Sequence, residues 1–460
     1  MLHEFWENFR HNLFKPLLLF FYMGFAVPIL GVAFEFPYVL YQGLTIYLLV
    51  SIGWKGGEEL ASLSAAELSQ AAGFMVVGFV LNFLLGIIAY GLLRAFTKLR
   101  KVDAATVAAY YGSDSAGTFV TCVGVLSGIQ AIVLATALSS SNVNSIDLGL
   151  GKEVTSERIS KALEDPKWVK DSSARGIDVE KVAAARDASD EYKPAAYMPV
   201  MLAIMEIPGC LVGLFLVSRM RHAGMDRLGN MPDEPGYNPL AKPDLPAAAA
   251  AHGGHGQPQA EDLMLEPAGT GEPAKPPSIF SPALLHEVFL NPGLFLLFGG
   301  IIIGFISRLQ GEKVTADDDP VFVDLFKGLL CLFLLEMGMT ASRRLKDLRT
   351  AGWRFVVFAL ITPNIFATIG MCTAHAYSLA IGEPFHLGTY VLFAVLCGAA
   401  SYIAVPAVQR LAIPEASPTL PLAASLGVTF SYNVTIGIPV YIEIAKMLNR
   451  ALPHGSHIIS

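Results

Sequence analysis

Two stretches decide the fold: Leu17–Val32 reads LLLFFYMGFAVPILGV, and Pro292–Ile306 reads PGLFLLFGGIIIGFI, without a charged residue in either. Uncharged apolar runs approaching about 18 residues are typical of helices that span a bilayer. The whole chain is 53% hydrophobic and only 15% charged, whereas soluble domains carry about 25% charged residues. A soluble protein would need buried helices that are apolar on every side. The sequence therefore predicts an all-α integral membrane protein.

Ten apolar segments follow one another along the chain, and each is long enough to be a candidate transmembrane helix. The segment at 104–138 exceeds what a bilayer requires and contains small and polar residues, which predicts an interrupted helix. The ten segments are 16–33, 37–53, 73–96, 104–138, 196–218, 285–307, 321–340, 354–381, 387–409 and 420–447.

Lysine and arginine in the short loops orient these segments, because cytoplasmic loops are enriched in both. If the spans alternate, four basic clusters fall on one side, which is then the cytoplasm, and both termini lie outside. The first apolar run lacks a following cleavage site and is interpreted as a retained span. The clusters are Arg94, Lys98, Arg100 and Lys101; Arg219 and Arg221; Arg343, Arg344, Lys346 and Arg349; and Arg410.

Two long polar loops divide the chain. Residues 142–192 form an external insertion, in which SERISKALEDPKW predicts a short helix or two. Residues 222–282 are rich in Ala, Gly and Pro and predict a flexible cytoplasmic linker. The domains are thus a first five-helix repeat (1–221), the linker, and a second repeat (283–460). The net charge of −7 gives no indication of nucleic-acid binding.

The two halves resemble each other at four places. Span two closes with Ile52-Gly-Trp-Lys-Gly and span seven with Met337-Gly-Met-Thr-Ala, 285 positions apart. Gly112-Ser-Asp-Ser interrupts span four, and Gly398-Ala-Ala-Ser interrupts span nine, 286 positions apart. The other matches are Pro16 with Pro292 and Ile207-Pro208 with Ile438-Pro439. Five spans per half give an inverted repeat, the architecture of many secondary transporters.

The motif from Tyr110 to Phe119 (YYGSDSAGTF) places glycines, hydroxyls and one carboxylate inside an apolar span. Backbone that leaves the helix at this depth is tolerated only where it lines a cavity or binds a ligand. Free N–H groups at a half-helix N-terminus suit an anion, and freed carbonyls and hydroxyls suit a cation such as sodium. The counterpart from Gly398 to Pro406 (GAASYIAVP) would complete a cradle of crossed half-helices.

Four residues are candidate sodium ligands: Asp114, Thr118, Glu206 and Asn433. A carboxylate inside a membrane is costly and marks a functional site by default. The alternatives are a solvated pore-lining role for Asp114, a structural carboxyl at Glu206, and interhelical hydrogen bonding for Asn433.

At these motifs the sequence resembles the sodium-dependent bicarbonate transporter family, which is known from the cyanobacterial carbon-concentrating system. The resemblance covers essentially all spans and excludes the two long loops. It is carried by LLVSIGWKGGEELA, KVDAATVAAYYGSDSAGTFV, MEIPGCLVG, LLEMGMTASRRLKDLR, CGAASYIAVPAVQRLAIPEASP and VTFSYNVTIGIPVY.

The resemblance implies a trimer in the bacterial inner membrane, with ten helices divided into a moving core domain and a static gate domain. It implies import of bicarbonate with sodium by an elevator-type motion, sodium being the coupling ion and no other cofactor being needed. It places substrate between the two interrupted helices. The substrate-binding residues carried over are Gly112, Ser113, Ser115, Ala116, Ala399, Ala400, Ser401 and Tyr402.

The chain departs from its cyanobacterial relatives in three respects. It has Asp114 where they have an apolar residue, and Tyr402 where they have an acidic one, so the sodium site is relocated or coupling differs. The insertion at 142–192 is the third departure, and it weakens the expectation of a PII-like cytoplasmic regulator.

Two alternatives remain open at this point. The same fold could carry another small monovalent anion, such as a short carboxylate, or form a passive anion channel. An enzyme is not expected, because no Ser/His/Asp set, HExxH or paired catalytic Asp motif falls at a plausible depth.

Overall fold

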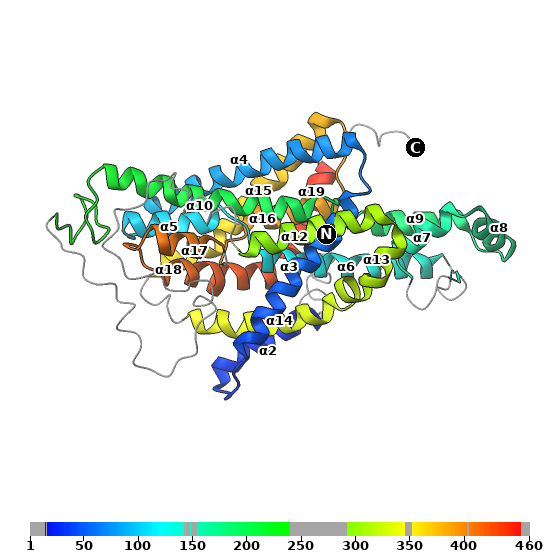
Figure 1. Ribbon diagram of the computed structural model, residues 1–460, viewed down its shortest axis with the longest axis horizontal. Helices are drawn as coiled ribbons and strands as arrows, with labels where there is room; N and C mark the ends of the chain where they lie inside the picture. The colour runs from blue at the N-terminus through cyan, green and yellow to red at the C-terminus, as the bar shows by residue number, and fades with distance from the viewer. Residues whose placement is uncertain are drawn as a thin grey trace.

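The computed structural model describes residues 14, 16–141, 143, 148–149, 154–239, 292–345, 352–402 and 404–451. These residues form helices and connecting loops without a strand, which confirms the predicted all-α class (Figure 1). The helices are α2 (Pro16–Leu30), α3 (Tyr38–Leu60), α4 (Ala65–Phe96), α5 (Lys101–Tyr111), α6 (Ala116–Ser140), α7 (Ser156–Glu164), α8 (Pro166–Ala174), α9 (Val179–Asp190), α10 (Met198–His222), α12 (Pro292–Gln310), α13 (Glu312–Asp319), α14 (Phe326–Arg344), α15 (Trp353–Ile381), α16 (Leu387–Gly398), α17 (Ala404–Ala412), α18 (Leu420–Leu422) and α19 (Ile438–Ala451), with π-helical turns η3 (Pro320–Asp324), η5 (Ala423–Phe430) and η6 (Asn433–Gly437).

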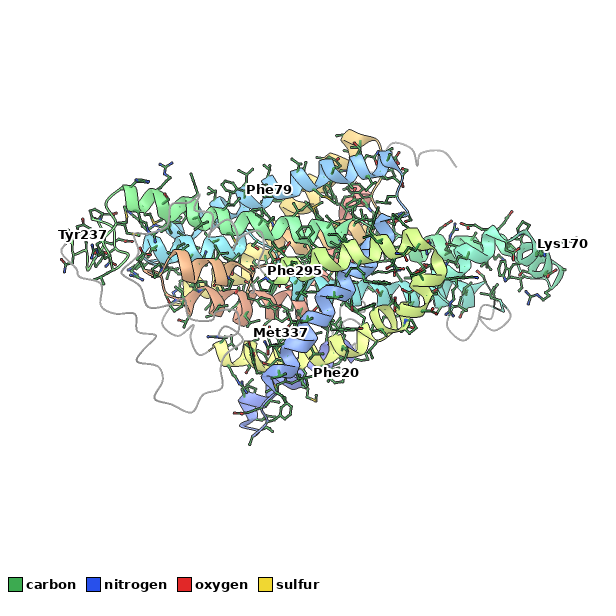
Figure 2. The ribbon with its side chains drawn as sticks, in the orientation of Figure 1. Phe20, Phe79, Lys170, Tyr237, Phe295 and Met337 are labelled. Atoms are coloured by element: carbon green, nitrogen blue, oxygen red, sulfur yellow. The ribbon has the colours of Figure 1, made fainter. Side chains whose placement is uncertain are left out.

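Six of these helical segments are long and apolar enough to cross a membrane, and α2 and α16 are shorter apolar helices. All ten predicted segments are helical over most of their described length, but the count of ten spans stays a prediction. Large apolar side chains such as Phe295, which is 67% exposed, lie on the outside of the helical body (Figure 2). The six segments are Ala65–Phe96, Lys101–Ser140, Met198–His222, Pro292–Gln310, Trp353–Ile381 and Leu420–Ala451.

The helices pack in two groups. In the first, α3 lies along α12 and α14 lies along α2. In the second, α4, α5 and α10 pack together, and α16 packs against α15 and α19. Close backbone approach explains the first group, because a Cβ added to Gly24 would overlap the carbonyl oxygen of Leu335, and one on Gly338 would overlap that of Phe21.

The same kind of approach joins α3 to α12. A Cβ on Gly300 would lie 2.7 Å from the carbonyl oxygen of Val50, and one on Gly53 would lie 2.5 Å from that of Leu297. Small residues at such crossings let membrane helices approach closely and gain van der Waals contact.

The described residues of the insertion at 142–192 include three short helices, α7, α8 and α9, which project at one end of the long axis (Figure 1). They bury Ile159, Val182 and Ala185 against Leu134 and Leu138 of α6 in a small separate core. Lys170 and Tyr237 mark the two opposite ends of the molecule (Figure 2).

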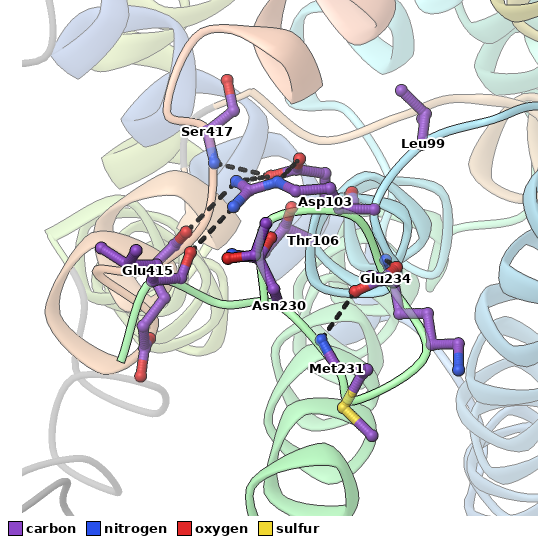
Figure 3. A network of polar contacts seen from close by, with 12 residues as sticks. Leu99, Asp103, Thr106, Asn230, Met231, Glu234, Glu415 and Ser417 are labelled. Atoms are coloured by element: carbon purple, nitrogen blue, oxygen red, sulfur yellow. Dashed lines mark hydrogen bonds and ion pairs between the residues drawn. The ribbon is translucent and has the colours of Figure 1, made fainter. Parts of the chain in front are cut away.

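The end of the molecule opposite the insertion carries a polar network (Figure 3). Arg100 forms an ion pair with Asp103 at 2.7 Å, and the amide of Ser417 donates to Asp103 at 2.8 Å. Arg221 pairs with Glu415 at 2.9 Å. Three of the predicted basic clusters lie in or next to the loops after α4, α10 and α17. The network therefore brings these three loops together at one end of the molecule.

The start of the predicted linker belongs to this network. Glu234 accepts from the amide of Lys101 at 2.7 Å and from that of Met231 at 2.9 Å (Figure 3). Asp226 accepts from the amides of Leu228, Asn230 and Asn238. Residues 223–239 thus form ordered turns, and residues 240–282 of the linker lie outside the described residues.

Candidate functional site

The first interruption separates α5 from α6. Gly112 ends α5, its amide donating to the carbonyls of Ala108 and Ala109. Ser115 caps α6: its hydroxyl oxygen accepts from the amide of Thr118 at 3.3 Å and from the Thr118 hydroxyl at 3.0 Å. A serine cap is favoured here because a helix N-terminus leaves orphan N–H groups.

The second interruption separates α16 from α17. Ala399 is extended, with φ −86° and ψ 177°, and α17 resumes at Ala404. The side-chain amide of Asn433 donates to the carbonyl of Gly398 at 2.9 Å, while its Oδ1 accepts from the Tyr441 hydroxyl at 2.7 Å. Asn433 therefore fixes the C-terminal end of α16.

The two interruptions touch each other. The Ser401 amide donates to the carbonyl oxygen of Tyr110, the next-to-last residue of α5, at 2.8 Å. The Tyr402 hydroxyl lies against Gly117 in the first turn of α6, so that a Cβ on Gly117 would overlap it. These contacts bring the two interruptions together, and that 112–116 and 399–402 form one substrate site stays a prediction.

Helix α10 closes one side of the first interruption. The Ser113 hydroxyl donates to the carbonyl of Glu206 at 2.9 Å. A Cβ on Gly209 would lie 2.5 Å from Cβ of Ser113, so only glycine allows this approach. Glu206 is 7% exposed, and the bond from Ser113 to its carbonyl places it beside the loop that carries Asp114.

Asp114 is the least satisfied polar group of the site. It is fully buried, and neither carboxylate oxygen has a hydrogen-bond partner among the described residues. It lies within electrostatic range of Glu206 of α10 and of Cys397 at the end of α16. A buried ionised carboxylate without a partner costs several kcal/mol, which a bound cation or proton would offset.

Asn82 of α4 borders the first interruption and is not among the residues predicted from the sequence. Its side-chain amide donates to the carbonyl of Met205 at 3.0 Å, and its backbone carbonyl would lie 3.2 Å from a Cβ on Gly112. Its Oδ1 is buried without a partner among the described residues. The available signal was a lone carboxamide within the apolar segment 73–96.

Aromatic rings separate the site from the α2 and α14 group. Tyr402 meets Phe430 edge-on at 5.5 Å, and Phe430 meets Phe21 of α2 at 5.9 Å. Tyr41 stacks on Phe333 at 6.0 Å. Sequence patterning could not find these contacts, because each ring is one of many apolar residues in its span.

A protein-family model matches most of the chain. Among curated proteins none matches the chain. The sequence model of the Na+-dependent bicarbonate transporter superfamily matches residues 16–139 and 181–446, which leaves out most of the insertion. This match covers most of the chain, including both interruptions, and the chain therefore belongs to the Na+-dependent bicarbonate transporter superfamily.

Proposed function

We propose that this membrane transporter carries bicarbonate together with sodium, binding both where the two interrupted helices meet. The observation that carries the proposal is the fully buried Asp114 carboxylate, unpartnered among the described residues, one residue before the cap of α6. It supplies a negative group for a cation directly beside a helix N-terminus that favours an anion.

The anion would lie at the first turn of α6. The amides of Ala116 and Gly117 precede any intrahelical acceptor, and the helix dipole adds positive potential there. Gly112, Ser113 and Ser115 would line the same side. From the second interruption, Ala399, Ala400, Ser401 and Tyr402 would face it. The Ser401 amide is used by Tyr110, so Ser401 would offer its hydroxyl.

The cation would be held by oxygen atoms between α6 and α10. Asp114 and Glu206 are two buried carboxyl groups within electrostatic range of each other, and sodium between them would offset the cost of ionising them. Thr118 supplies a hydroxyl, and Asn433 Oδ1 keeps a second lone pair beside its bond from Tyr441. Asn82 Oδ1 adds a further buried oxygen on the neighbouring helix α4.

We further propose that the chain consists of two inverted repeats. Support comes from glycine contacts that occur once in each half. Gly24 packs against the carbonyl of Leu335, and Gly300 packs against the carbonyl of Val50 in the corresponding way. Gly24 and Gly300 are 276 positions apart, as Pro16 and Pro292 are, and Val50 and Leu335 are 285 apart, as Ile52 and Met337 are. The contact of Gly338 with the Phe21 carbonyl corresponds in the same way to the contact of Gly53 with the Leu297 carbonyl. Gly338 and Gly53 are 285 positions apart, and Leu297 and Phe21 are 276 apart.

Alternating access would move the group of α4, α5, α6, α10, α15, α16, α17 and α19 as a core domain against a gate of α2, α3, α12 and α14. The aromatic contacts of Tyr402, Phe430 and Phe21 lie at that boundary. A homotrimer in the inner membrane, with both termini outside, completes the proposal.

The test is uptake of labelled bicarbonate into proteoliposomes with and without an inward sodium gradient. We expect saturable uptake that requires sodium. Competition by formate or acetate would instead identify a short carboxylate as substrate, and sodium-independent conductance would identify a channel. Uptake no greater than in empty liposomes would refute bicarbonate as the substrate.

A further inference from the structure

A groove of about 540 Å³ opens between α4 and α15 at the end of the molecule that carries the polar network. It is separate from the proposed substrate site. Nearly all of its lining is apolar, and among the described residues that line it Arg354 is the one that carries a charge. The lining residues are Leu92, Ala95, Phe96, Trp353, Arg354, Val357, Phe358, Ile361, Thr362 and Ile365.

The opposite end of the same helix pair is closed. There the Tyr377 hydroxyl of α15 donates to the Gln70 carbonyl of α4 at 2.7 Å. Phe74 stacks on Tyr377 at 5.1 Å, and a Cβ on Gly73 would lie 2.5 Å from the Tyr377 hydroxyl. The groove therefore lies at the end of the pair away from the Phe74–Tyr377 contact.

Arg354 is an exposed cation at the groove. Its guanidinium lies 5.7 Å from the ring of Trp353, which is 71% exposed. No carboxylate pairs with Arg354 among the residues the structure describes. Arg94, the neighbour in sequence of the lining residue Ala95, differs in this respect, because its guanidinium lies 4.0 Å from the Glu234 carboxylate. An amphipathic tryptophan beside a cation is typical of the level of lipid headgroups.

We propose that this groove binds an anionic phospholipid, with one acyl chain along its apolar wall and the headgroup phosphate on Arg354. Charge complementarity selects this occupant, because a guanidinium binds a phosphate with paired hydrogen bonds. A small soluble anion would make no use of the apolar wall. Basic sites between transmembrane helices are where anionic headgroups bind.

The floor of the groove adjoins the interrupted helix. Phe358 lines the groove, is 6% exposed, and meets the ring of Tyr111 edge-on at 4.9 Å. Tyr111 is the last residue of α5, and its hydroxyl lies 2.7 Å from that of Thr429. A bound acyl chain adds contacts behind this aromatic pair, so the lipid should raise the melting temperature of the protein.

The experiment measures lipid binding to the purified full-length protein by native mass spectrometry and by thermal shift, with phosphatidylglycerol and phosphatidylcholine as probes. Arg354→Gln is expected to weaken phosphatidylglycerol binding about fivefold, the equivalent of one lost cation at a membrane surface, and to leave phosphatidylcholine binding unchanged. Ala95→Trp, which fills the groove, is expected to weaken binding of both lipids.

Arg219 is the matched control, because its guanidinium also lies over an aromatic ring, that of Phe215 at 5.9 Å, but outside the groove. Arg219→Gln is expected to bind both lipids as the wild type does. Equal losses in Arg219→Gln and Arg354→Gln would overturn the proposal, as would wild-type phosphatidylglycerol binding by Arg354→Gln. Since Arg354 is exposed, its substitution does not threaten folding.

Discussion

The backbone amide of Ser401 donates to the carbonyl oxygen of Tyr110 over 2.8 Å, joining residues that are 291 positions apart. The bond lies where both helices are interrupted, so it fixes one half-helix relative to the other. It also removes the Ser401 amide from the groups available to an anion.

Substituting Ser401 by proline tests this bond, because proline has no N–H. We expect Ser401→Pro to lower the free energy of unfolding by about 1–3 kcal/mol and to reduce uptake at least tenfold. Ser401→Ala keeps the amide and should keep the stability, with any effect confined to the concentration dependence of uptake. Thermal unfolding of the two purified variants distinguishes them; equal stability would show that the bond does not matter.

Asp114→Asn tests the proposed cation site. Removing the charge should reduce sodium-dependent uptake at least tenfold while leaving the folded protein in the membrane, since an uncharged amide is less costly to bury. The measurement is uptake against sodium concentration.

Glu336 is the matched control for Asp114, as a carboxyl within α14 whose Oε1 accepts from Thr340 at 2.7 Å. Glu336→Gln should retain the sodium dependence. An Asp114→Asn protein with unchanged sodium dependence would remove Asp114 from the site.

Gly117→Ala would place a methyl group on the Tyr402 hydroxyl. We expect it to displace Tyr402 and to reduce uptake roughly tenfold. Adding Tyr402→Phe removes the obstructing oxygen and should restore part of the uptake, if the contact rather than the methyl group itself is responsible. Gly124→Ala, which would meet only leucine methyl groups, should have a smaller effect. Failure of the double variant to recover would argue against the contact.

Gly304 and Gly299 of α12 form a matched pair for the α3–α12 crossing. A Cβ on Gly304 would overlap the Trp54 carbonyl, a backbone atom that cannot move aside, whereas one on Gly299 would meet no atom within 4 Å. We expect Gly304→Ala to destabilise the protein by about 1–3 kcal/mol and Gly299→Ala to be nearly neutral. The melting temperatures of both variants measure this, and similar values would contradict the close crossing.

Asp226 should make the loop at 223–239 sensitive to acid. Burial acts to raise its pKa, but the hydrogen bonds from Asn238, Asn230 and Leu228 outweigh burial and hold the pKa below its ordinary value. A pKa that is lower in the folded state gives stability above the unfolded pKa, about 3.9, which is lost as pH falls through the folded value.

Hydrogen exchange of the loop amides measures this effect. Asp226→Asn should speed exchange of these amides at pH 7. At low pH, where Asp226 of the wild type is protonated, the exchange rates of the two proteins should become similar. Asp233→Asn is the control, because Asp233 is 66% exposed in its pair with Lys101 and such pairs contribute little. Equal acceleration in both variants would contradict the role assigned to Asp226.

Much of the fold could be predicted from local pattern. Uncharged runs predicted helices, and glycine with serine inside the runs at 104–138 and 387–409 predicted the two interruptions, which the structure has at 112–115 and 399–402. Asn82 and the ring of Phe430 were not found, because one carboxamide or one phenylalanine in an apolar span has no periodic signal. The hydrogen-bonded turns of residues 223–239 were not predicted. The prediction of a flexible linker used the amino-acid composition of the whole segment 222–282, which says nothing of individual hydrogen bonds.

The sequence by itself determined the all-α class, the positions of the apolar helices, the interruptions and the family. These depend on hydrophobicity, on glycine and on motif order, which are properties of short stretches. Only the tertiary structure decided that Ser401 bonds to Tyr110, that Tyr402 lies on Gly117, and that Asp114 is buried beside Glu206 without a hydrogen-bond partner among the described residues. These relationships join spans far apart in the chain. Their geometry is fixed by which glycines allow two backbones to meet, and no local pattern contains that information.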